Sequence, residues 1–281
     1  MINHKYCPYI SFVVNPTEVL DNNNLTDLFH VGDDLTRVIE TFNRQISALK
    51  ENFSFERLSL NRVDLCCDLT LASSDEVAAY IALLRKSNCK KGYKIKGRKI
   101  KDYDPNIGFL CENPSAGVSV SVYNKAEQLK NIGRPKEAEK AENRLRIEVQ
   151  LKSKKAIYKY RQYGSNSEQL EFIIDTARER IRTVLPDILI DADYYTLPEA
   201  IRIVAEYKSG KKRDRMIRLL ELTSKKHSIR LGAEQLMLYD PDITPKCIKR
   251  LKENFHAINV NIVTLGRRSK GAFLESLIGR L

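Results

Sequence analysis

The sequence predicts an α+β protein in which an antiparallel-rich sheet carries helices on one face and is followed by a helical domain. Three segments alternate apolar and polar residues as half-buried strands do: residues 57–71, 117–125 and 143–152. Beyond residue 153, the apolar residues recur at helical spacing instead. We therefore place a first domain over residues 1–190 and a helical domain over residues 191–281.

Shorter elements surround the three strands in the first half of the chain. Residues 9–14 form a compact run rich in β-formers, and residues 33–52 and 75–86 have the apolar spacing of helices. Serines before the second helix are suitable N-caps, and the acidic residues in its first turn suit the helix dipole. Residues 126–142 are charged and interrupted by glycine and proline, so we expect a surface excursion there.

The second half of the chain has the pattern of six helices. They are expected over residues 153–163, 167–185, 197–207, 211–225, 231–239 and 245–254. Thr244 and Pro245 suit the cap and the first position of the last helix. The last two helices resemble a helix-turn-helix or winged-helix unit, with a basic packing helix as the alternative.

Positive charge is concentrated in two parts of the chain. Lys and Arg number 48 against 36 Asp and Glu, which gives a net charge of +12. Residues 85–101 hold nine basic residues and no acidic one, and residues 208–252 hold thirteen basic residues against five acidic ones. Such segments suit a polyanion, because each cation near a phosphate displaces condensed counterions. A basic protein with no such partner is the alternative.

Several classes of protein find no support in the sequence. The six cysteines form no CxxC motif, and no HExxH or GxSxG motif occurs. No apolar run approaches the ~20 residues that cross a bilayer, and the N-terminal residues lack the pattern of a secretory signal. We therefore expect a cytoplasmic protein with reduced thiols and no membrane partner.

The polar faces of the three strands carry chemically useful side chains. If the strands share one sheet, a single face collects Arg62, Asp64, Asp68, Tyr123, Lys125, Arg144, Arg146 and Glu148. Carboxylate oxygens are the ligands that hard cations such as Mg²⁺ prefer, and a tyrosine near a lysine can supply an oxygen nucleophile beside a positive charge. The set fits phosphoryl transfer from a DNA backbone to tyrosine. An ordinary solvated sheet face is the alternative.

Three short motifs lie in order on these strands: Arg62-Val63-Asp64, then Tyr123-Asn124-Lys125-Ala126-Glu127, then Arg146-Ile147-Glu148. They resemble the R-[IV]-D, Y-x-K-x-x-E and R-[FIW]-E motifs of the rolling-circle replication initiators of filamentous phages and of the related Rep-trans group. The resemblance covers about residues 55–165 and includes a basic helix over residues 152–163. The second motif is one residue shorter here, and the paired-histidine metal motif of the broader relaxase group is missing.

The resemblance implies an enzyme that nicks and religates one DNA strand through a phosphotyrosine intermediate, which starts rolling-circle replication of a phage or plasmid. It implies Tyr123 as the nucleophile, Lys125 as its partner, and Asp64 and Glu148 as ligands of a divalent metal ion, Mg²⁺ or Mn²⁺. Asp68 shares the face of Asp64 and is added to the metal ligands. The side chains expected to contact DNA are Arg62, Arg144, Arg146, Lys246, Lys249 and Arg250.

Residues 1–190 would then cut and join DNA, and residues 191–281 would recognise the origin. The expected partners are origin DNA in double- and single-stranded form and the host helicase and polymerase, and a homodimer is left open. A second catalytic tyrosine is also left open, with Tyr103, Tyr158 and Tyr160 as candidates. The alternative function is a non-catalytic, sequence-specific DNA-binding regulator, which would leave the tyrosine and the carboxylates without a role.

Overall fold

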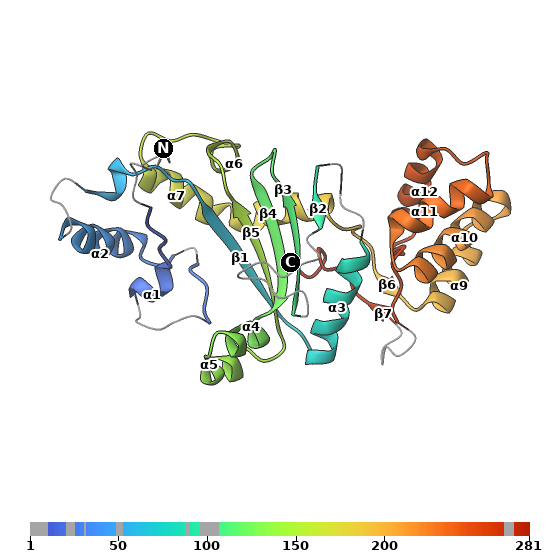
Figure 1. Ribbon diagram of the computed structural model, residues 1–281, viewed down its shortest axis with the longest axis horizontal. Coiled ribbons are helices and arrows are strands. Elements are labelled where there is room, and N and C mark those ends of the chain that lie inside the picture. Colours follow the sequence, from blue (N-terminus) through green and yellow to red (C-terminus); the bar gives the residue numbers. More distant parts are fainter. Residues whose placement is uncertain are drawn as a thin grey trace, which may run out of the picture. The chain divides into compact units, whose positions relative to one another are not determined.

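The computed structural model describes residues 11–20, 26–30, 32–48, 53–87, 90, 92–95, 107–266 and 273–281 (Figure 1). The chain forms two compact units, residues 1–59 with 163–174, and residues 60–162 with 175–281. The expected boundary at residue 190 lies inside the second unit, and the division of function that it marks stays a prediction. No helix in the described residues has the length and apolar character needed to cross a membrane.

The first unit is built around aromatic contacts. It contains α1 (Pro16–Leu20), α2 (Leu35–Ser47), the short 3₁₀ helix η1 (Phe55–Arg57) and most of α7 (Asn166–Asp175). The Phe42 ring of α2 meets the Phe12 and Phe55 rings edge to face, with centroids 5.6 and 6.2 Å apart. The expected β-rich run over residues 9–14 is wrong for residues 11–14, which form no strand. Residues 9 and 10 lie outside the described residues.

The second unit contains a five-stranded sheet in the order β1-β5-β4-β3-β2, and every neighbouring pair is antiparallel. Its strands are β1 (Val63–Thr70), β2 (Lys94–Ile95), β3 (Gly108–Asn113), β4 (Val118–Asn124) and β5 (Arg144–Leu151). The α+β class and the antiparallel sheet predicted from the alternating segments are therefore confirmed. The motif strands β1, β5 and β4 are direct neighbours, which places their polar faces side by side.

Helices cover the apolar face of this sheet. Helix α3 (Ser74–Lys86) packs on β3, β4 and β5, and α8 (Ala177–Val184) packs on β1 and β5. The Ser73 hydroxyl accepts the Glu76 N–H and caps α3, as the sequence predicted. The side chains of Leu145, Ile147 and Val149 on β5 are completely buried beneath these helices. Burial of the apolar face leaves the opposite face for polar side chains.

The excursion expected over residues 126–142 lies between β4 and β5, and it contains α4 (Lys125–Asn131) and α5 (Pro135–Lys140). The Asn124 side chain accepts the Glu127 N–H and starts α4 directly after β4.

Two expectations about helices are wrong. The helix expected over residues 153–163 is reduced to the four-residue α6 (Lys154–Ile157). The helix expected over residues 167–185 is broken into α7 and α8.

The C-terminal part of the chain is helical, as predicted. It contains α9 (Leu197–Tyr207), α10 (Gly210–Lys226), α11 (Ile229–Tyr239) and α12 (Pro245–Ala257), and 3₁₀ helix η2 (Leu185–Asp187) precedes it. Thr244 accepts the Cys247 N–H at 3.3 Å and caps α12, with Pro245 as its first residue. Met216 and Leu219 of α10 and Phe255 of α12 are fully buried, so these helices share a core.

Residues 273–281, here called the C-terminal clasp, connect the helical part to α3. Strand β7 (Phe273–Leu274) pairs with β6 (Tyr194–Tyr195), which precedes α9. The Tyr80 hydroxyl of α3 donates to the Glu275 carbonyl (3.0 Å), and the Arg280 guanidinium donates to Glu76 Oε1 (2.8 Å). Tyr80 is nearly inaccessible to solvent, so the clasp covers part of the α3 surface.

Candidate active site

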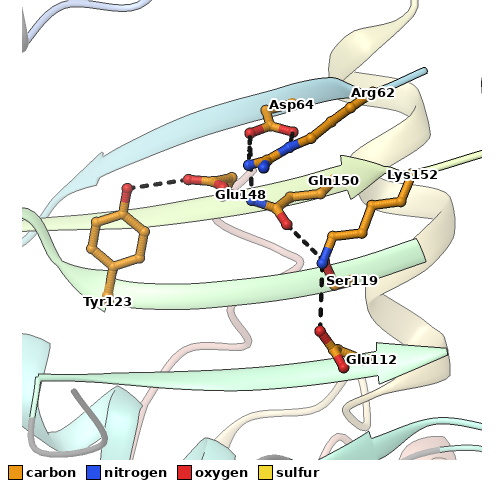
Figure 2. Close-up of polar contacts among 8 residues, drawn as sticks. All are labelled: Arg62, Asp64, Glu112, Ser119, Tyr123, Glu148, Gln150 and Lys152. Atoms are coloured by element: carbon orange, nitrogen blue, oxygen red, sulfur yellow. Dashed lines mark hydrogen bonds and ion pairs between the residues drawn. The ribbon is translucent and has the colours of Figure 1, made fainter. Parts of the chain in front are cut away.

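The motif side chains lie on the polar face of β1, β5 and β4, in rows set by the strand register. Three successive rows cross the face: Asp68, Arg146 and Tyr123, then Cys66, Glu148 and Ser121, then Asp64, Gln150 and Ser119. The candidate nucleophile Tyr123 is therefore opposite an arginine, and the carboxylate of Glu148 is its diagonal neighbour. The sheet brings Tyr123, Arg146, Glu148 and Asp64 onto one surface, as expected from the three motifs. Figure 2 shows Tyr123, Glu148 and Asp64 on this face.

Tyr123 is partly buried and its hydroxyl donates to Glu148 Oε2 at 3.2 Å (Figure 2). Burial, and next the negative charge of Glu148, raise the pKa of the Tyr123 phenol well above its usual range. The phenol is consequently protonated at neutral pH. It needs a base, or added positive charge beside Glu148, before its oxygen can act as a nucleophile.

Gly108 of β3 leaves space for the Tyr123 side chain because it has no Cβ. It is the residue opposite Tyr123 in the register, and a Cβ at Gly108 would lie 2.8 Å from Tyr123 Cβ and 3.1 Å from the Val122 carbonyl oxygen. Real Cβ atoms do not approach that closely, so a side chain here would displace the tyrosine or β4. The Gly108 carbonyl is held by the Arg85 guanidinium of α3, with Nη2 at 2.9 Å.

Arg146 and Asp68 form a two-pronged ion pair beside Tyr123. Arg146 Nε and Nη2 each donate to a different oxygen of Asp68 at 2.7 Å, and Arg144 Nη1 approaches the same carboxylate at 3.4 Å. Arg146 is only 6% exposed, so its charge is matched inside the protein. Both oxygens of Asp68 are thus engaged by arginines. The role of Asp68 as a metal ligand stays a prediction, and it would require these bonds to be shared or broken.

Lys125 starts α4 directly after β4 and is 5% exposed. Burial, and next the charge of Arg146, lower the pKa of Lys125 to about 8. Its Nζ donates to Gln128 Oε1 at 3.0 Å, and the described contacts include no hydrogen bond from Lys125 to Tyr123. Lys125 therefore lies at the edge of the site in the structure. A direct role beside the tyrosine oxygen stays a prediction.

Asp64 and Glu148, the other expected metal ligands, are connected through Gln150. Gln150 Nε2 donates to Glu148 Oε1 and, at 3.4 Å, to Asp64 Oδ2, and Gln150 Oε1 accepts the Ser119 hydroxyl. Arg62 forms a two-pronged ion pair with Asp64 at the edge of the sheet. Two carboxylates form a donor set of the kind that Mg²⁺ accepts, because this ion uses one or two carboxylates together with water and substrate phosphate. The Gln150 amide oxygen accepts from Ser119 and is directed away from this pair. Among the described residues, no group of three or more His, Cys, Asp and Glu side chains could hold a metal ion.

The remaining expected DNA contacts lie on α12. Lys246, Lys249 and Arg250 are all exposed on α12, which follows α11 and a short loop. The helix-turn-helix interpretation of these two helices stays a prediction. In the basic stretch over residues 85–101, Lys90 Nζ pairs with Asp187 Oδ1 at 2.9 Å. Residues 96–106, which include Tyr103, lie outside the described residues.

Sequence reasoning missed the positions of Gly108 and Gln150. A glycine inside a strand is a signal of close backbone approach, but β3 was not among the predicted strands. Gln150 belongs to none of the three sequence motifs, and only the register shows that it lies opposite Asp64.

Comparisons with known proteins give no match: no family model, no curated protein and no solved structure is significantly similar to this chain.

Proposed function

We propose that this protein nicks and religates one strand of DNA at a replication origin through a covalent bond to Tyr123. The observation that carries the proposal is the hydrogen bond from the Tyr123 hydroxyl to Glu148, beside Arg146, which lies opposite Tyr123 in the register. An ordinary solvated sheet face does not need a half-buried tyrosine, a nearly buried lysine and a buried arginine within one surface. A site for phosphoryl transfer does, because the reaction needs a nucleophile, a proton acceptor and positive charge together.

In this proposal the Tyr123 oxygen attacks the scissile phosphorus and the bond from phosphorus to the 3′ oxygen breaks. The phenol proton passes to Glu148, which already accepts its hydrogen bond, and the departing strand leaves with a free 3′-hydroxyl after taking up a proton. In the proposal, Arg146 and Lys125 supply positive charge to the phosphate oxygens, and Arg146 would share its bonds to Asp68 with them. The 5′-phosphotyrosine conserves the bond energy, so the reverse reaction religates the strand without ATP.

A divalent cation bound by Asp64 and Glu148 would supply charge to the scissile phosphate, as Mg²⁺ does in other phosphoryl transfers. Gln150 holds these two carboxylates together and keeps them on the Tyr123 side of the sheet. The proposal extends to the C-terminal part of the chain, where α12 would select the origin duplex. It also includes a cytoplasmic setting and a host helicase and polymerase as partners.

The test is covalent capture of DNA by the full-length protein. Supercoiled plasmid that carries the protein's own gene region is incubated with Mg²⁺ or Mn²⁺, and open-circular DNA attached to protein is detected after denaturation with detergent. We expect Tyr123→Phe to abolish the adduct and to leave DNA binding nearly intact, because only one oxygen atom is removed. Tyr207→Phe is a matched control, since Tyr207 is 63% exposed on α9 and should change nothing.

Nicking by Tyr123→Phe at the wild-type rate would assign the nucleophile to another tyrosine or to water. If the wild-type protein binds the region specifically and never nicks it, the non-catalytic regulator becomes the better description.

A further inference from the structure

The chain that follows β5 carries unassigned positive charge. Residues 152–161, here called the basic segment, contain five exposed cations: Lys152, Lys154, Lys155, Lys159 and Arg161. No acidic residue occurs between Glu148 and Glu168. Within the described part of the chain, Lys154, Lys155 and Lys159 have no carboxylate partner, and Lys152 has one long contact with Glu112 at 3.4 Å. Because α6 occupies only residues 154–157, much of the segment is not helical.

The basic segment starts on the same face as the candidate active site. Lys152 directly follows β5 and continues its series of alternate residues that includes Glu148 and Gln150 (Figure 2). At about 3.3 Å per residue, Lys152 lies about 13 Å along the strand direction from Glu148. Its backbone N–H donates to the Gly117 carbonyl at 2.7 Å, which fixes the segment to the turn between β3 and β4. Gly117 has a φ of +65° and leaves no space for a Cβ, which would lie 2.1 Å from Ser153 Oγ.

An open hollow of about 230 Å³ lies at this end of the sheet. Its lining includes Glu112, Gly117, Ser119, Lys152 and Ser153. Figure 2 shows Lys152 reaching across the strand ends toward Glu112 above Ser119. The hollow therefore continues the polar face away from Tyr123 and has a lysine at its rim.

At the other end of the basic segment, the Tyr160 ring is exposed and lies against two cationic side chains. Tyr160 is 48% exposed. The Arg180 guanidinium lies 4.8 Å from the ring centroid and Lys159 Nζ lies 5.2 Å from it. Arg180 is itself buried and donates to Thr176 Oγ1 at 2.8 Å, so the guanidinium that supports the ring is fixed.

We propose that the basic segment binds the single strand next to the scissile phosphate, with the lysines on successive phosphates and one unpaired base stacked on Tyr160. Exposed aromatic rings among cations bind single strands without regard to sequence, because every base has a face that can stack. The occupant is single-stranded rather than duplex DNA, since a paired base cannot lie on the Tyr160 ring. The inference rests on the proposed function, because it uses Tyr123 to define where the strand lies.

The experiment measures binding of fluorescein-labelled oligothymidine to the full chain by anisotropy over a range of salt concentrations, in EDTA and with Tyr123→Phe as the background. We expect Lys152→Ala/Lys154→Ala/Lys155→Ala to weaken binding more than tenfold and to reduce the salt slope by roughly two, at about 0.7 for each phosphate that is no longer neutralised. The matched control removes three exposed lysines of α4 and α5, Lys130, Lys136 and Lys140, and should leave both values unchanged.

Tyr160→Ala should weaken binding by about fivefold to 100-fold, whereas Tyr160→Phe keeps the stacking face and should bind as the wild type does. Equal weakening in the triple variant and its control would reduce the effect to net charge and overturn the inference, as would unchanged binding by Tyr160→Ala. This assay needs no cleavage, so it is independent of the nicking test. If the variants weaken binding as expected but the wild-type protein never forms the adduct, the proposed function is contradicted and the single-strand surface is not.

Discussion

The polar face of the sheet and the C-terminal helices are both rich in arginine and lysine, but they hold that charge differently. On the sheet, Arg146 is 6% exposed and its guanidinium is matched by Asp68. On α12, Lys246, Lys249 and Arg250 are exposed, and Lys249 reaches Glu253 only at 3.8 Å. Charge that is buried and paired positions its neighbours, whereas exposed charge remains available to a phosphate backbone. Net charge in a sequence does not distinguish the two.

The largest effect is expected from the carboxylates of the sheet. Asp64→Asn and Glu148→Gln each remove a negative charge with almost no change of shape, so nicking of a site-containing oligonucleotide should fall by about 10²-fold or more while the melting temperature stays close to that of the wild type. Undiminished nicking in EDTA would remove the metal from the mechanism.

The next effect concerns the stability of the paired charges. Asp68→Asn leaves the buried Arg146 without a counter-charge, and we expect the free energy of unfolding in urea to fall by roughly 3 kcal/mol. The matched substitution on α12, Glu253→Gln, breaks an exposed pair and should leave the unfolding curve unchanged. If the two variants have equal free energies of unfolding, the buried pair on the sheet and the exposed pair on α12 do not differ in their contribution to stability.

A pH dependence should distinguish Lys125 from the exposed lysines. Its pKa of about 8 in the folded protein lies below the value near 10.4 of an unfolded chain, so the unfolded state binds more protons between these values and stability rises with pH there. From pH 8 to pH 10, the wild type should gain roughly 2 kcal/mol of unfolding free energy relative to Lys125→Met. Lys249→Met, measured in the same way, should show no such gain, and a parallel pH dependence of wild type and Lys125→Met would contradict the lowered pKa.

The smallest effect is expected from the exposed charges. Replacing Lys246, Lys249 and Arg250 together by Ala should weaken origin duplex binding about tenfold and reduce its salt slope by roughly one unit for each phosphate that the helix no longer neutralises. Nicking of a single-stranded oligonucleotide should be unchanged. An unaltered duplex affinity and slope would make α12 a packing helix.

Much of the fold follows from patterns that are local in sequence. Alternation identified β1, β4 and β5 and sorted their side chains between faces, because a strand has a period of two. The caps of α3 and α12 were visible in Ser73, Thr244 and Pro245. The failures were also local: the helix after Ser153 stopped after one turn, and the helix expected over residues 167–185 is divided into α7 and α8.

The details of the site depend on register, which alternation does not specify. A shift of two residues between β1 and β5 would keep every side chain on its face and still separate Asp68 from Arg146. The same shift would remove Gln150 from its place opposite Asp64. The sequence could therefore predict which residues share the surface, but not that an arginine takes both oxygens of one aspartate.

The C-terminal clasp constrains how such a protein can exchange parts by recombination. A crossover near residue 190 would bring a new set of helices, but it would also replace Glu275 and Arg280, which meet Tyr80 and Glu76 of the retained α3. The incoming chain must supply a matching end, or the junction must leave residues 273–281 with their original sheet. Under the proposed function, a change of origin specificity would therefore succeed most readily as an internal replacement of α10–α12, with both flanking segments kept.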